Sequence, residues 1–271
     1  MSELRLHLSL KRRLLVECQI QCEEDLHVGI GRGETTVTAA DLPVQRDSRG
    51  SPFIPGSSLR GAFRSHIHRL LTSLEASEDE VTKKDLLGEE HVTMNEGEER
   101  EFVEATGEKK NALFEKLGVI QMLFGASGFA SPLRFTDARL MNGGEIRRRV
   151  HVSIDLGTDR VRKGALADLE SVVGGSTFSF IMVFDELSDK HMRVANKVFY
   201  TWLKGLAIND GVEMFLGGWK SRGYGLCKVK ISSIKEYTPR KLVLGDAVET
   251  YATQQLATFL DSVLAELQGA R

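Results

Sequence analysis

The sequence predicts an α+β fold, in which helices lie on one face of an antiparallel sheet. Apolar and polar residues alternate along three segments, as they do in strands with one buried face: residues 14–21, 174–185 and 226–231. Two longer segments, 57–74 and 188–206, instead repeat their apolar residues at helical spacing. The order of strand, helix, several strands, helix and strand is typical of helices packed on a single antiparallel sheet.

The first strand and the first helix are the best defined of these elements. Every second residue between Leu14 and Ile20 is apolar, which places one side of the strand in the core. The helix follows the sequence PGSS, in which Ser57 and Ser58 are both good N-cap residues. Its apolar face begins at Leu59, and the opposite face is basic.

The start of this helix is also a candidate anion site. A Gly-Ser-Ser sequence offers backbone N–H groups and hydroxyls to an anion, and the helix dipole adds to the attraction. Arg60 and Arg64 follow directly behind Ser57 and Ser58. Because the chain lacks the other parts of a nucleotide-hydrolase loop, a phosphate of a polynucleotide is the expected ligand. The alternative is an ordinary loop followed by a helix with a solvated basic face.

A strongly charged segment, residues 75–112, separates the first helix from the strands that follow. It contains few aromatic or β-branched residues, which predicts an exposed insertion that is helical or partly mobile. Residues 75–110 carry 13 acidic and 5 basic side chains, a local balance of −8 in a chain whose net charge is −2. The rest of the chain is therefore basic, which gives weak support for an anionic partner.

Short strands and a basic segment come next along the chain. Residues 134–139 and 151–155 have strand character, and the sequence Asn-Gly-Gly at 142–144 marks a tight turn between them. The segment 140–166 is unusually rich in arginine. A last helix is expected at residues 247–267, where packing on the core and contact with a partner are both possible explanations.

A glycine-rich loop precedes the strand at 226–231. It combines glycines, which let a backbone approach a ligand closely, with cationic, hydroxyl and aromatic side chains suited to RNA: Gly217, Gly218, Trp219, Lys220, Ser221, Arg222 and Tyr224. The loop is not a P-loop, because Trp219 stands where that motif has a glycine before its lysine. It is not a dinucleotide-binding motif either, because a strand follows it. A plain hairpin connection is the alternative.

Composition and cysteine usage exclude several classes of protein. No apolar run approaches the length of a transmembrane span, and the N-terminus lacks the apolar region of a secretory signal. We therefore expect a cytoplasmic protein with no membrane partner. The three cysteines are too few for a four-cysteine zinc site and form no CxxC pair, so they are expected to be buried free thiols: Cys18, Cys22 and Cys227.

Three motifs together resemble the RAMP superfamily of CRISPR-associated proteins, and specifically the repeated backbone subunit of type III effector complexes. They occur in the order that the family has them: DLPVQRD leading to IPGSSLRGAFR at 41–64, LFGASGFASPLRFTDARL at 123–140, and GGWKSRGYG at 217–225. The resemblance covers residues 10–235 apart from the charged insertion. Its specificity comes mainly from the first and last motifs.

This resemblance implies a fold and a way of binding RNA. The expected fold is a single RAMP domain over residues 1–271, with a ferredoxin-like or RRM-like core, a helical insertion and a protruding β-hairpin. In the family, the region that matches 140–166 forms this hairpin, the thumb, which lies across a guide–target duplex and displaces a nucleotide pair at regular intervals. The resemblance implies that its arginines follow the phosphate backbone: Arg147, Arg148, Arg149 and Arg162.

The resemblance also implies a catalytic residue. Asp41 aligns with an aspartate that the family requires for cutting target RNA. A carboxylate near the scissile phosphate can bind Mg²⁺ or another divalent metal ion, or can orient the RNA 2′-hydroxyl for attack. A turn or a side-chain cap beside Pro43 is the structural alternative. Asp47 is expected to cap the turn that follows it, and His151 is a candidate accessory acid.

The resulting prediction is a guide-RNA-binding backbone subunit of a type III CRISPR complex, with metal-dependent endoribonuclease activity on target RNA. The implied partners are guide crRNA, target RNA, other CRISPR effector subunits and further copies of the chain in a helical backbone. Base pairing, and not the protein, would read the sequence. Three alternatives stay open: a non-catalytic structural RNA-binding subunit, a guide-processing endoribonuclease, and a protein-interaction module unrelated to nucleic acid.

Overall fold

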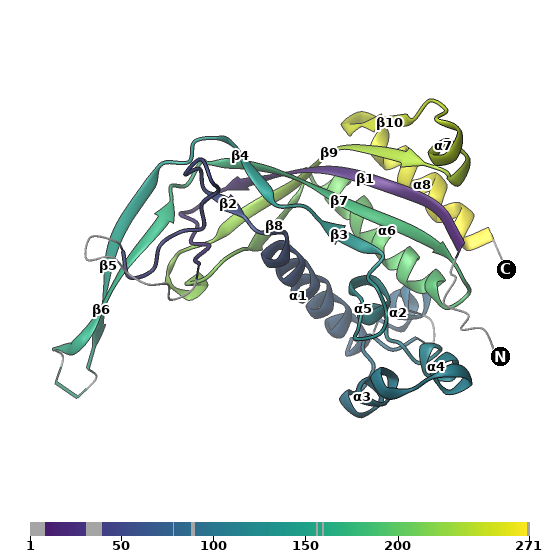
Figure 1. Ribbon diagram of the computed structural model, residues 1–271, viewed down its shortest axis with the longest axis horizontal. Coiled ribbons are helices and arrows are strands. Elements are labelled where there is room, and N and C mark those ends of the chain that lie inside the picture. Colours follow the sequence, from purple (N-terminus) through teal and green to yellow (C-terminus); the bar gives the residue numbers. More distant parts are fainter. Residues whose placement is uncertain are drawn as a thin grey trace.

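One antiparallel sheet forms the centre of this computed structural model, which describes residues 9–30, 40–77, 79–87, 90–155, 157–158 and 160–269 (Figure 1). The side chains of residues 162–165 lie outside the described part. The sheet has eight strands: β1 (Ser9–Cys22), β2 (Phe53–Ile54), β3 (Leu133–Phe135), β4 (Ala138–Asn142), β7 (Thr177–Ser188), β8 (Val212–Phe215), β9 (Leu226–Tyr237) and β10 (Glu249–Ala252).

The order of the strands in space identifies a ferredoxin-like core. Its four central strands lie in the order β9–β1–β7–β4, and each neighbouring pair is antiparallel. Along the chain, α1 (Gly56–Glu75) follows β1, and α6 (Met192–Ile208) lies between β7 and β9. This β-α-β-β-α-β connectivity is that of the ferredoxin-like motif. The predicted fold class is therefore confirmed.

Helices α1 and α6 lie against one face of this sheet (Figure 1). Phe63 of α1 packs its ring 5.9 Å from that of Phe180 on β7 and 5.3 Å from that of Trp202 on α6, measured between centroids. Phe184 and Phe199 pack in the same way at 4.1 Å. Burying each such side chain stabilises the fold by about 2 kcal/mol. The alternating residues that predicted β1 and β7 are thus the ones that form the core.

The charged insertion folds into short helices: α2 (Glu80–Leu86), α3 (Glu96–Glu104) and α4 (Gly107–Phe114), followed by α5 (Val119–Phe124). Asp79 caps α2 by accepting a hydrogen bond from the Thr82 N–H at 3.0 Å, and Asn95 caps α3 in the same way. Phe102 and Leu113 are buried, so the insertion has a packed side and is not exposed throughout. Figure 1 shows that it lies at the opposite end of the molecule from the hairpin.

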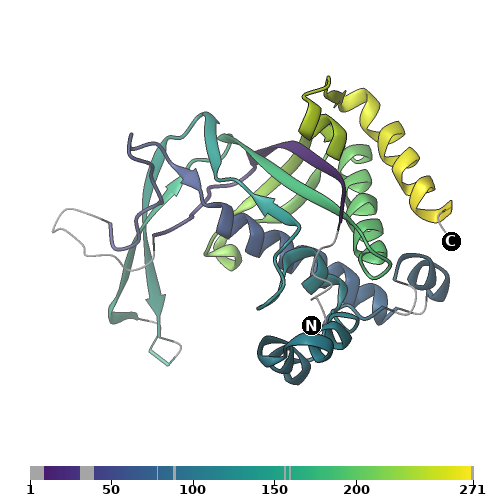
Figure 2. The ribbon, with the colours of Figure 1, turned by 45° about the vertical axis from the view of Figure 1, so that its right-hand side comes forward.

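A separate two-stranded ribbon, β5 (Ile146–Ile154) paired with β6 (Val161–Val172), protrudes from the core (Figures 1 and 2). The hairpin strands thus span residues 146–172, whereas the sequence predicted a hairpin at 140–166. The difference arises because residues 140–142 continue β4, and Gly143 and Gly144 then turn the chain with positive φ angles. The Gly144 N–H donates to the Ser176 hydroxyl at 3.0 Å, which ties this turn to the start of β7.

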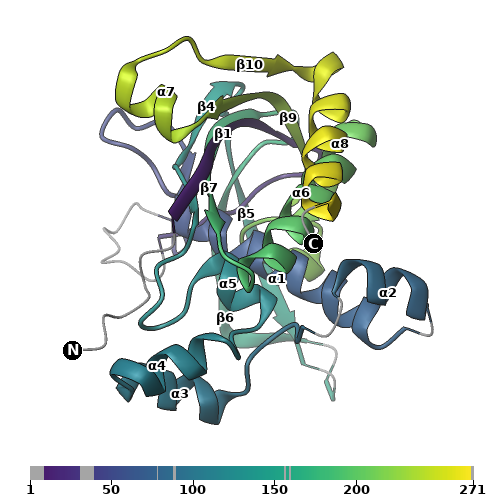
Figure 3. The same ribbon diagram turned by 90° about the vertical axis from the view of Figure 1, so that its right-hand side faces the viewer.

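The C-terminal region contains more elements than the sequence predicted (Figure 3). Residues 249–252 pair with β9 as β10, so the last helix, α8, begins at Thr253 and ends at Gly269. It packs on α6. Helix α7 (Pro239–Leu244) precedes β10, and a short 3₁₀ turn, η1 (Lys220–Arg222), precedes β9. The three cysteines are free and buried, as predicted. None of the helices in the described ranges is long and apolar enough to cross a membrane.

Candidate nucleic-acid interface

The residues singled out in the sequence gather at one end of the core, beside the base of the hairpin. In both Figure 1 and Figure 2, the loop before β2, the start of α1 and the glycine-rich loop lie at this end. The helical insertion lies at the other end. Segments that are far apart in sequence therefore share one region of the surface.

The loop that carries Asp41 runs along the edge of β6. Leu42 and Leu169 form a parallel bridge, in which the Leu42 N–H donates to the Asp168 carbonyl and the Glu170 N–H donates to the Leu42 carbonyl, both at 3.0 Å. The Asp41 side chain is exposed, and its Oδ2 accepts a hydrogen bond from the Asp168 N–H at 3.1 Å. Asp41 thus bonds to the hairpin base rather than forming a local cap beside Pro43.

Basic and acidic side chains alternate around Asp41. Arg148 of β5 forms an ion pair with Asp168, and this hydrogen bond is the main reason that the pKa of Arg148 is raised. The negative charge of Asp41 adds to that shift. The Glu170 carboxylate lies 3.0 Å from the Arg46 guanidinium and also accepts from the Val44 N–H. Two cations thus lie near Asp41, and each of them is paired with a carboxylate of β6.

The residues around Asp41 do not form a metal cage by themselves. In the part of the chain that the structure describes, no group of three or more His, Cys, Asp or Glu side chains is placed to hold a metal ion. Magnesium commonly keeps several waters and binds through one or two carboxylates together with substrate phosphates. Asp41 has one carboxylate oxygen that is not engaged by Asp168. With this one oxygen as a protein ligand, the site suits a metal ion whose other ligands come from RNA and water.

The glycine-rich loop is held against the segment at residues 25–27. The Gly218 N–H donates to the His27 carbonyl at 2.9 Å, and a Cβ atom at Gly217 would lie 2.2 Å from that same oxygen. Only glycine fits so close an approach at a φ of +70°. Burial lowers the pKa of His27, so its imidazole is neutral at pH 7 and its Nδ1–H donates to the Glu170 carbonyl at 2.7 Å.

This packing directs the cationic part of the loop to solvent. Lys220, Ser221 and Arg222 are exposed on η1. Trp219 has a left-handed backbone conformation, and the Arg222 guanidinium lies 4.3 Å from the centre of its ring. Such a stacked pair keeps the guanidinium in a fixed position while its N–H groups remain free for a phosphate.

Tyr224 cannot stack on a base in this arrangement, so the predicted role of its ring is wrong. Only 1% of the residue is exposed, and Arg149 lies over the ring at 5.9 Å. Its hydroxyl hydrogen-bonds to the His151 Nε2 at 2.8 Å, and the His151 ring packs on Trp219 at 4.9 Å. Tyr224 and His151 therefore join the glycine-rich loop to the hairpin. The Nε2 atom of His151 is occupied, which leaves the accessory-acid role as a prediction only.

Asp25 also joins the glycine-rich loop to the hairpin, and no pattern in the sequence indicated this role. It is 7% exposed, and its carboxylate lies 3.2 Å from Arg147 and 3.3 Å from Arg149, both on β5. It also accepts from the Gly174 N–H at 3.1 Å, while its backbone carbonyl accepts from the Gly225 N–H at 2.8 Å. Asp25 thus binds the hairpin through its carboxylate and the glycine-rich loop through its backbone carbonyl.

The start of α1 differs from the prediction. The helix begins at Gly56 with Pro55 as the N-cap, so Ser57 and Ser58 lie in the first turn and make no side-chain cap. Their side chains are exposed. The Gly56 N–H is already taken by the Asp137 carboxylate at 2.8 Å, which leaves fewer free N–H groups for an anion than expected.

The remaining arginines are placed as follows. Arg60 donates to the Phe124 carbonyl, and Arg64 is half-buried on the same helix. Arg147 and Arg149 share one face of the hairpin, and Arg148 lies on the other. The side chain of Arg162 lies outside the described part of the structure.

Removing the two cationic side chains of η1 should weaken RNA binding. We expect Lys220→Ala with Arg222→Ala to reduce the slope of log K against log salt by about 0.7 for each phosphate that the loop no longer binds. The measurement is binding of a single-stranded RNA oligonucleotide over a range of salt concentrations. A matched control removes two exposed cations at other sites, Lys190→Ala with Arg240→Ala. An unchanged slope in the first double variant would remove this loop from the interface.

The family profile and the individual relatives that match this chain indicate the same family. The profile of the RAMP superfamily matches residues 19–228. The chain is 28% identical over 231 residues to the CRISPR system Cms endoribonuclease Csm3 of Methanocaldococcus jannaschii, covering 84% of this chain and 82% of that protein. It is 27% identical over 237 residues to the protein of the same name from Streptococcus thermophilus, covering 83% and 90%.

Solved structures of type III complexes are also similar to this chain. A crystal structure of a Csm3–Csm4 subcomplex from the type III-A CRISPR–Cas interference complex matches with a TM-score of 0.48 and 22% identity. The match covers 94% of this chain and 98% of the solved chain. A subunit of a type III-B Cmr-β complex bound to cognate target RNA matches with a TM-score of 0.47 and 15% identity, covering 90% and 62%.

Proposed function

The chain belongs to the RAMP superfamily, and we propose that it is the guide-RNA-binding backbone subunit of a type III CRISPR complex that cleaves target RNA. The two relatives described above both carry the name endoribonuclease. The observation that carries the proposal is the meeting of Asp41, the glycine-rich loop and the arginine-rich hairpin at one end of the core. A carboxylate beside cations can orient a reacting hydroxyl while the cations stabilise the charge that develops on a phosphate.

RNA binding rests on the exposed cations of η1, the start of α1 and the hairpin. Lys220, Ser221 and Arg222 contact phosphates from the loop, and Ser57 and Ser58 do so from the first turn of α1. Gly217 and Gly218 pack against His27 and so hold the loop, with its cations, in place for RNA. Because these groups recognise phosphate and ribose rather than base edges, the protein binds any guide sequence and leaves recognition to base pairing.

Cleavage uses the nucleophile that RNA itself carries. The 2′-oxygen attacks the adjacent phosphorus, the bond from phosphorus to the 5′-oxygen breaks, and the 2′-hydroxyl proton is lost as the 5′-oxygen gains one. The protein needs to align these atoms and stabilise the developing charge. Asp41 orients the 2′-hydroxyl, and the nearby Arg148 and Arg46 stabilise charge on the phosphate.

A divalent ion fits this site if the RNA helps to hold it. The free oxygen of Asp41 and an RNA phosphate would bind it, and the ion would supply Lewis-acid stabilisation of the phosphoryl charge. The chain's own residues hold the carboxylate in place through the Asp168 N–H and keep the loop on the edge of β6. Mg²⁺ is the expected ion.

Assembly with further copies fits the surface of the hairpin. The face that carries Arg148 also bears a row of exposed apolar residues, for example Val150 at 63% and Leu166 at 62%. A backbone subunit presents different surfaces to the copies before and after it, and the ribbon of β5 and β6 extends well away from the core (Figure 1). Other effector subunits would bind the first and the last copy of the chain in such a backbone.

Binding of single-stranded RNA across salt concentrations tests the proposal. We expect log K to fall linearly with log salt, with a slope of about −0.7 for each phosphate contacted. Several oligonucleotides of unrelated sequence should bind with similar affinity. A chain that binds no RNA at low salt would instead be a protein-interaction module.

A further inference from the structure

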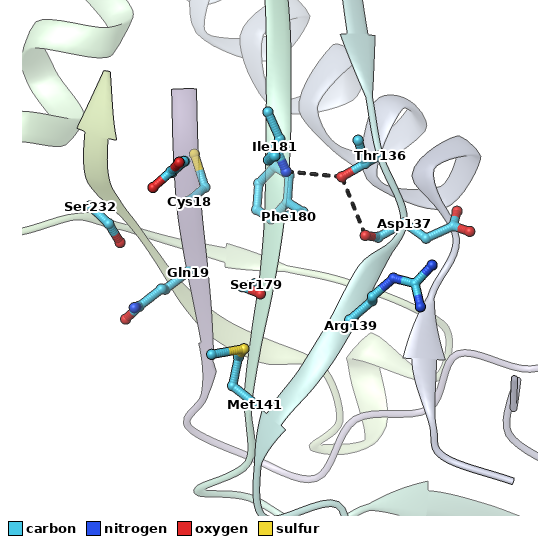
Figure 4. Close-up of a pocket in the computed structure, with 11 residues that line it drawn as sticks. Cys18, Gln19, Thr136, Asp137, Arg139, Met141, Ser179, Phe180, Ile181 and Ser232 are labelled. Atoms are coloured by element: carbon cyan, nitrogen blue, oxygen red, sulfur yellow. Dashed lines mark hydrogen bonds between the residues drawn. The ribbon is translucent and has the colours of Figure 1, made fainter. Parts of the chain in front are cut away.

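Two hollows on the surface meet at Asp137 and Arg139, on either side of β4. The larger, about 650 Å³, lies on the face of the sheet that the helices leave open, over β1, β7 and β4 (Figure 4). The smaller, about 350 Å³, lies between β4 and the loop at residues 46–53. Figure 4 shows the side chains of Asp137 and Arg139 extending away from Gln19 and Ser179. They line the smaller hollow as well.

We propose that this smaller hollow is a phosphate-binding pocket for bound RNA. We call it the arginine pocket and define it by its charged residues: Arg46, Asp47, Arg49, Asp137 and Arg139. The inference rests on the proposed function, because it assigns a further contact to the RNA that the chain binds. The charged residues of the pocket belong to neither the glycine-rich loop, nor the hairpin strands, nor α1.

The two carboxylates of the pocket are engaged by the protein backbone. Asp47 Oδ1 accepts from the Arg49 N–H at 2.9 Å and from the Ser51 N–H at 3.0 Å, which shapes the turn as the sequence predicted. Asp137 Oδ1 accepts from the Gly56 N–H at 2.8 Å. Each carboxylate therefore has a structural partner in the backbone, and neither forms an ion pair with an arginine of the pocket.

The arginines supply the free donors. Arg46 is paired with Glu170, but Arg49 and Arg139 are exposed, and no carboxylate of the described residues lies within ion-pair distance of either. A guanidinium presents several N–H donors in a planar fork that matches two oxygens of one phosphate. Two such groups lining one hollow are suited to hold a phosphodiester from both sides.

The position of the pocket favours RNA as its occupant. Arg46 lies on the same loop as Asp41. Phe53 of β2 lies just before the first turn of α1, and it pairs with Arg139 of β4. Along the chain, the loop that lines the pocket thus lies between Asp41 and the helix start that carries Ser57. An RNA strand that contacts both Asp41 and the start of α1 would place one of its phosphates at the arginine pocket.

The loop is also shaped before any ligand arrives. Arg46 and Pro52 form an antiparallel bridge, and the Gly50 N–H donates to the Asp47 carbonyl at 3.0 Å. Gly50 has a φ of +81°, as the turn requires. Because the backbone is already ordered, only the arginine side chains lose freedom when phosphate binds.

The test compares two double variants that remove the same charge. Arg49→Ala with Arg139→Ala should weaken RNA binding on the order of tenfold at physiological salt and lower the salt slope. The control, Arg69→Ala with Arg240→Ala, removes two exposed arginines elsewhere and should have a clearly smaller effect. Thermal unfolding of both variants checks that the fold is intact. The probes are a guide-length single-stranded RNA and the same RNA paired with its complementary target.

The outcomes separate this inference from the proposed function. A loss of affinity with the single strand assigns the phosphate to the guide, and a loss only with the paired RNA assigns it to the target; both support the pocket. Equal affinities for the two double variants would overturn the inference while leaving wild-type RNA binding intact. Unchanged RNA binding with loss of a co-purifying subunit would instead identify a protein carboxylate as the occupant and would also overturn it. Failure of the wild type to bind RNA would contradict the proposed function itself.

Discussion

Replacing Asp41 with alanine should abolish cleavage of bound target RNA and leave guide binding and target pairing nearly unchanged. The rate should fall by about 10² to 10⁴-fold, as expected when a group acting on the reacting hydroxyl is removed. The carboxylate repels phosphate in the ground state, so its loss costs transition-state stabilisation and little binding. The measurement is single-turnover cleavage of a target paired with guide, beside the affinity of the same RNA.

Two further variants separate charge from structure at this position. Asp41→Asn keeps a side-chain oxygen that can accept from the Asp168 N–H, so the loop stays on β6 while the negative charge is lost. It should be as inactive as Asp41→Ala. Asp47→Ala removes the bonds to the Arg49 and Ser51 N–H groups, and should slow cleavage less, through loop order alone.

The substrate offers an independent check on the same chemistry. A target with a 2′-deoxy nucleotide at the cut position should resist cleavage, because the internal nucleophile is absent. If Asp41→Ala cuts at the wild-type rate, the catalytic assignment fails. The chain would then be an RNA-binding scaffold, and any nuclease activity of the complex would belong to another subunit.

Replacing Asp25 with alanine should have the largest effect on the integrity of the interface. Asp25 is buried and holds Arg147, Arg149 and the Gly174 N–H. We expect a loss of about 2 kcal/mol in unfolding free energy, because a charged hydrogen-bond acceptor is removed from a buried site. Cleavage should fall at least on the order of tenfold, since small misplacements of the reacting groups are costly. RNA affinity should not fall, because two arginines are freed from a carboxylate.

A matched control for Asp25 is available on the same hairpin. Asp168→Asn removes the carboxylate partner of Arg148, but that pair is more exposed, so stability should change by less than about 1 kcal/mol. Asp25→Asn keeps an acceptor for the Gly174 N–H, so its loss of unfolding free energy should lie between those of Asp25→Ala and Asp168→Asn. Chemical denaturation and cleavage rates measure both effects. An Asp25→Ala protein with wild-type stability and wild-type cleavage would show that the hairpin does not depend on this residue.

The core could be predicted because its signals are local. The alternation along β1 and β7 and the helical spacing of Leu59 and Phe63 correspond directly to buried side chains. Short edge strands such as β8 and β10 have only four residues each, too few for periodicity to identify. The hairpin limits were displaced because residues 140–142 belong to β4, which ends at the Gly143-Gly144 turn, and because β6 continues to Val172.

The site was only partly predictable, for a similar reason. Asp47 was correctly assigned to its turn, since its bonds lie two and four residues away. Asp25 was missed because its partners Arg147, Ser171 and Gly174 lie 122, 146 and 149 residues further along the chain. Tyr224 was assigned wrongly, because no local pattern shows that Arg149 and His151 cover it. Residue types suited to RNA could be read from the sequence, but burial depends on contacts between distant segments.

Purification of the native complex tests the central claim most directly. The chain would be tagged at its exposed end of α8 or at its N-terminus, isolated from its own cells under mild salt, and the co-purifying RNA sized and sequenced. The account predicts RNAs in a narrow set of lengths, with a common repeat-derived portion and varied guide sequences, together with other CRISPR effector subunits. Isolation of the chain with no RNA, or with random fragments and no such subunits, would contradict it.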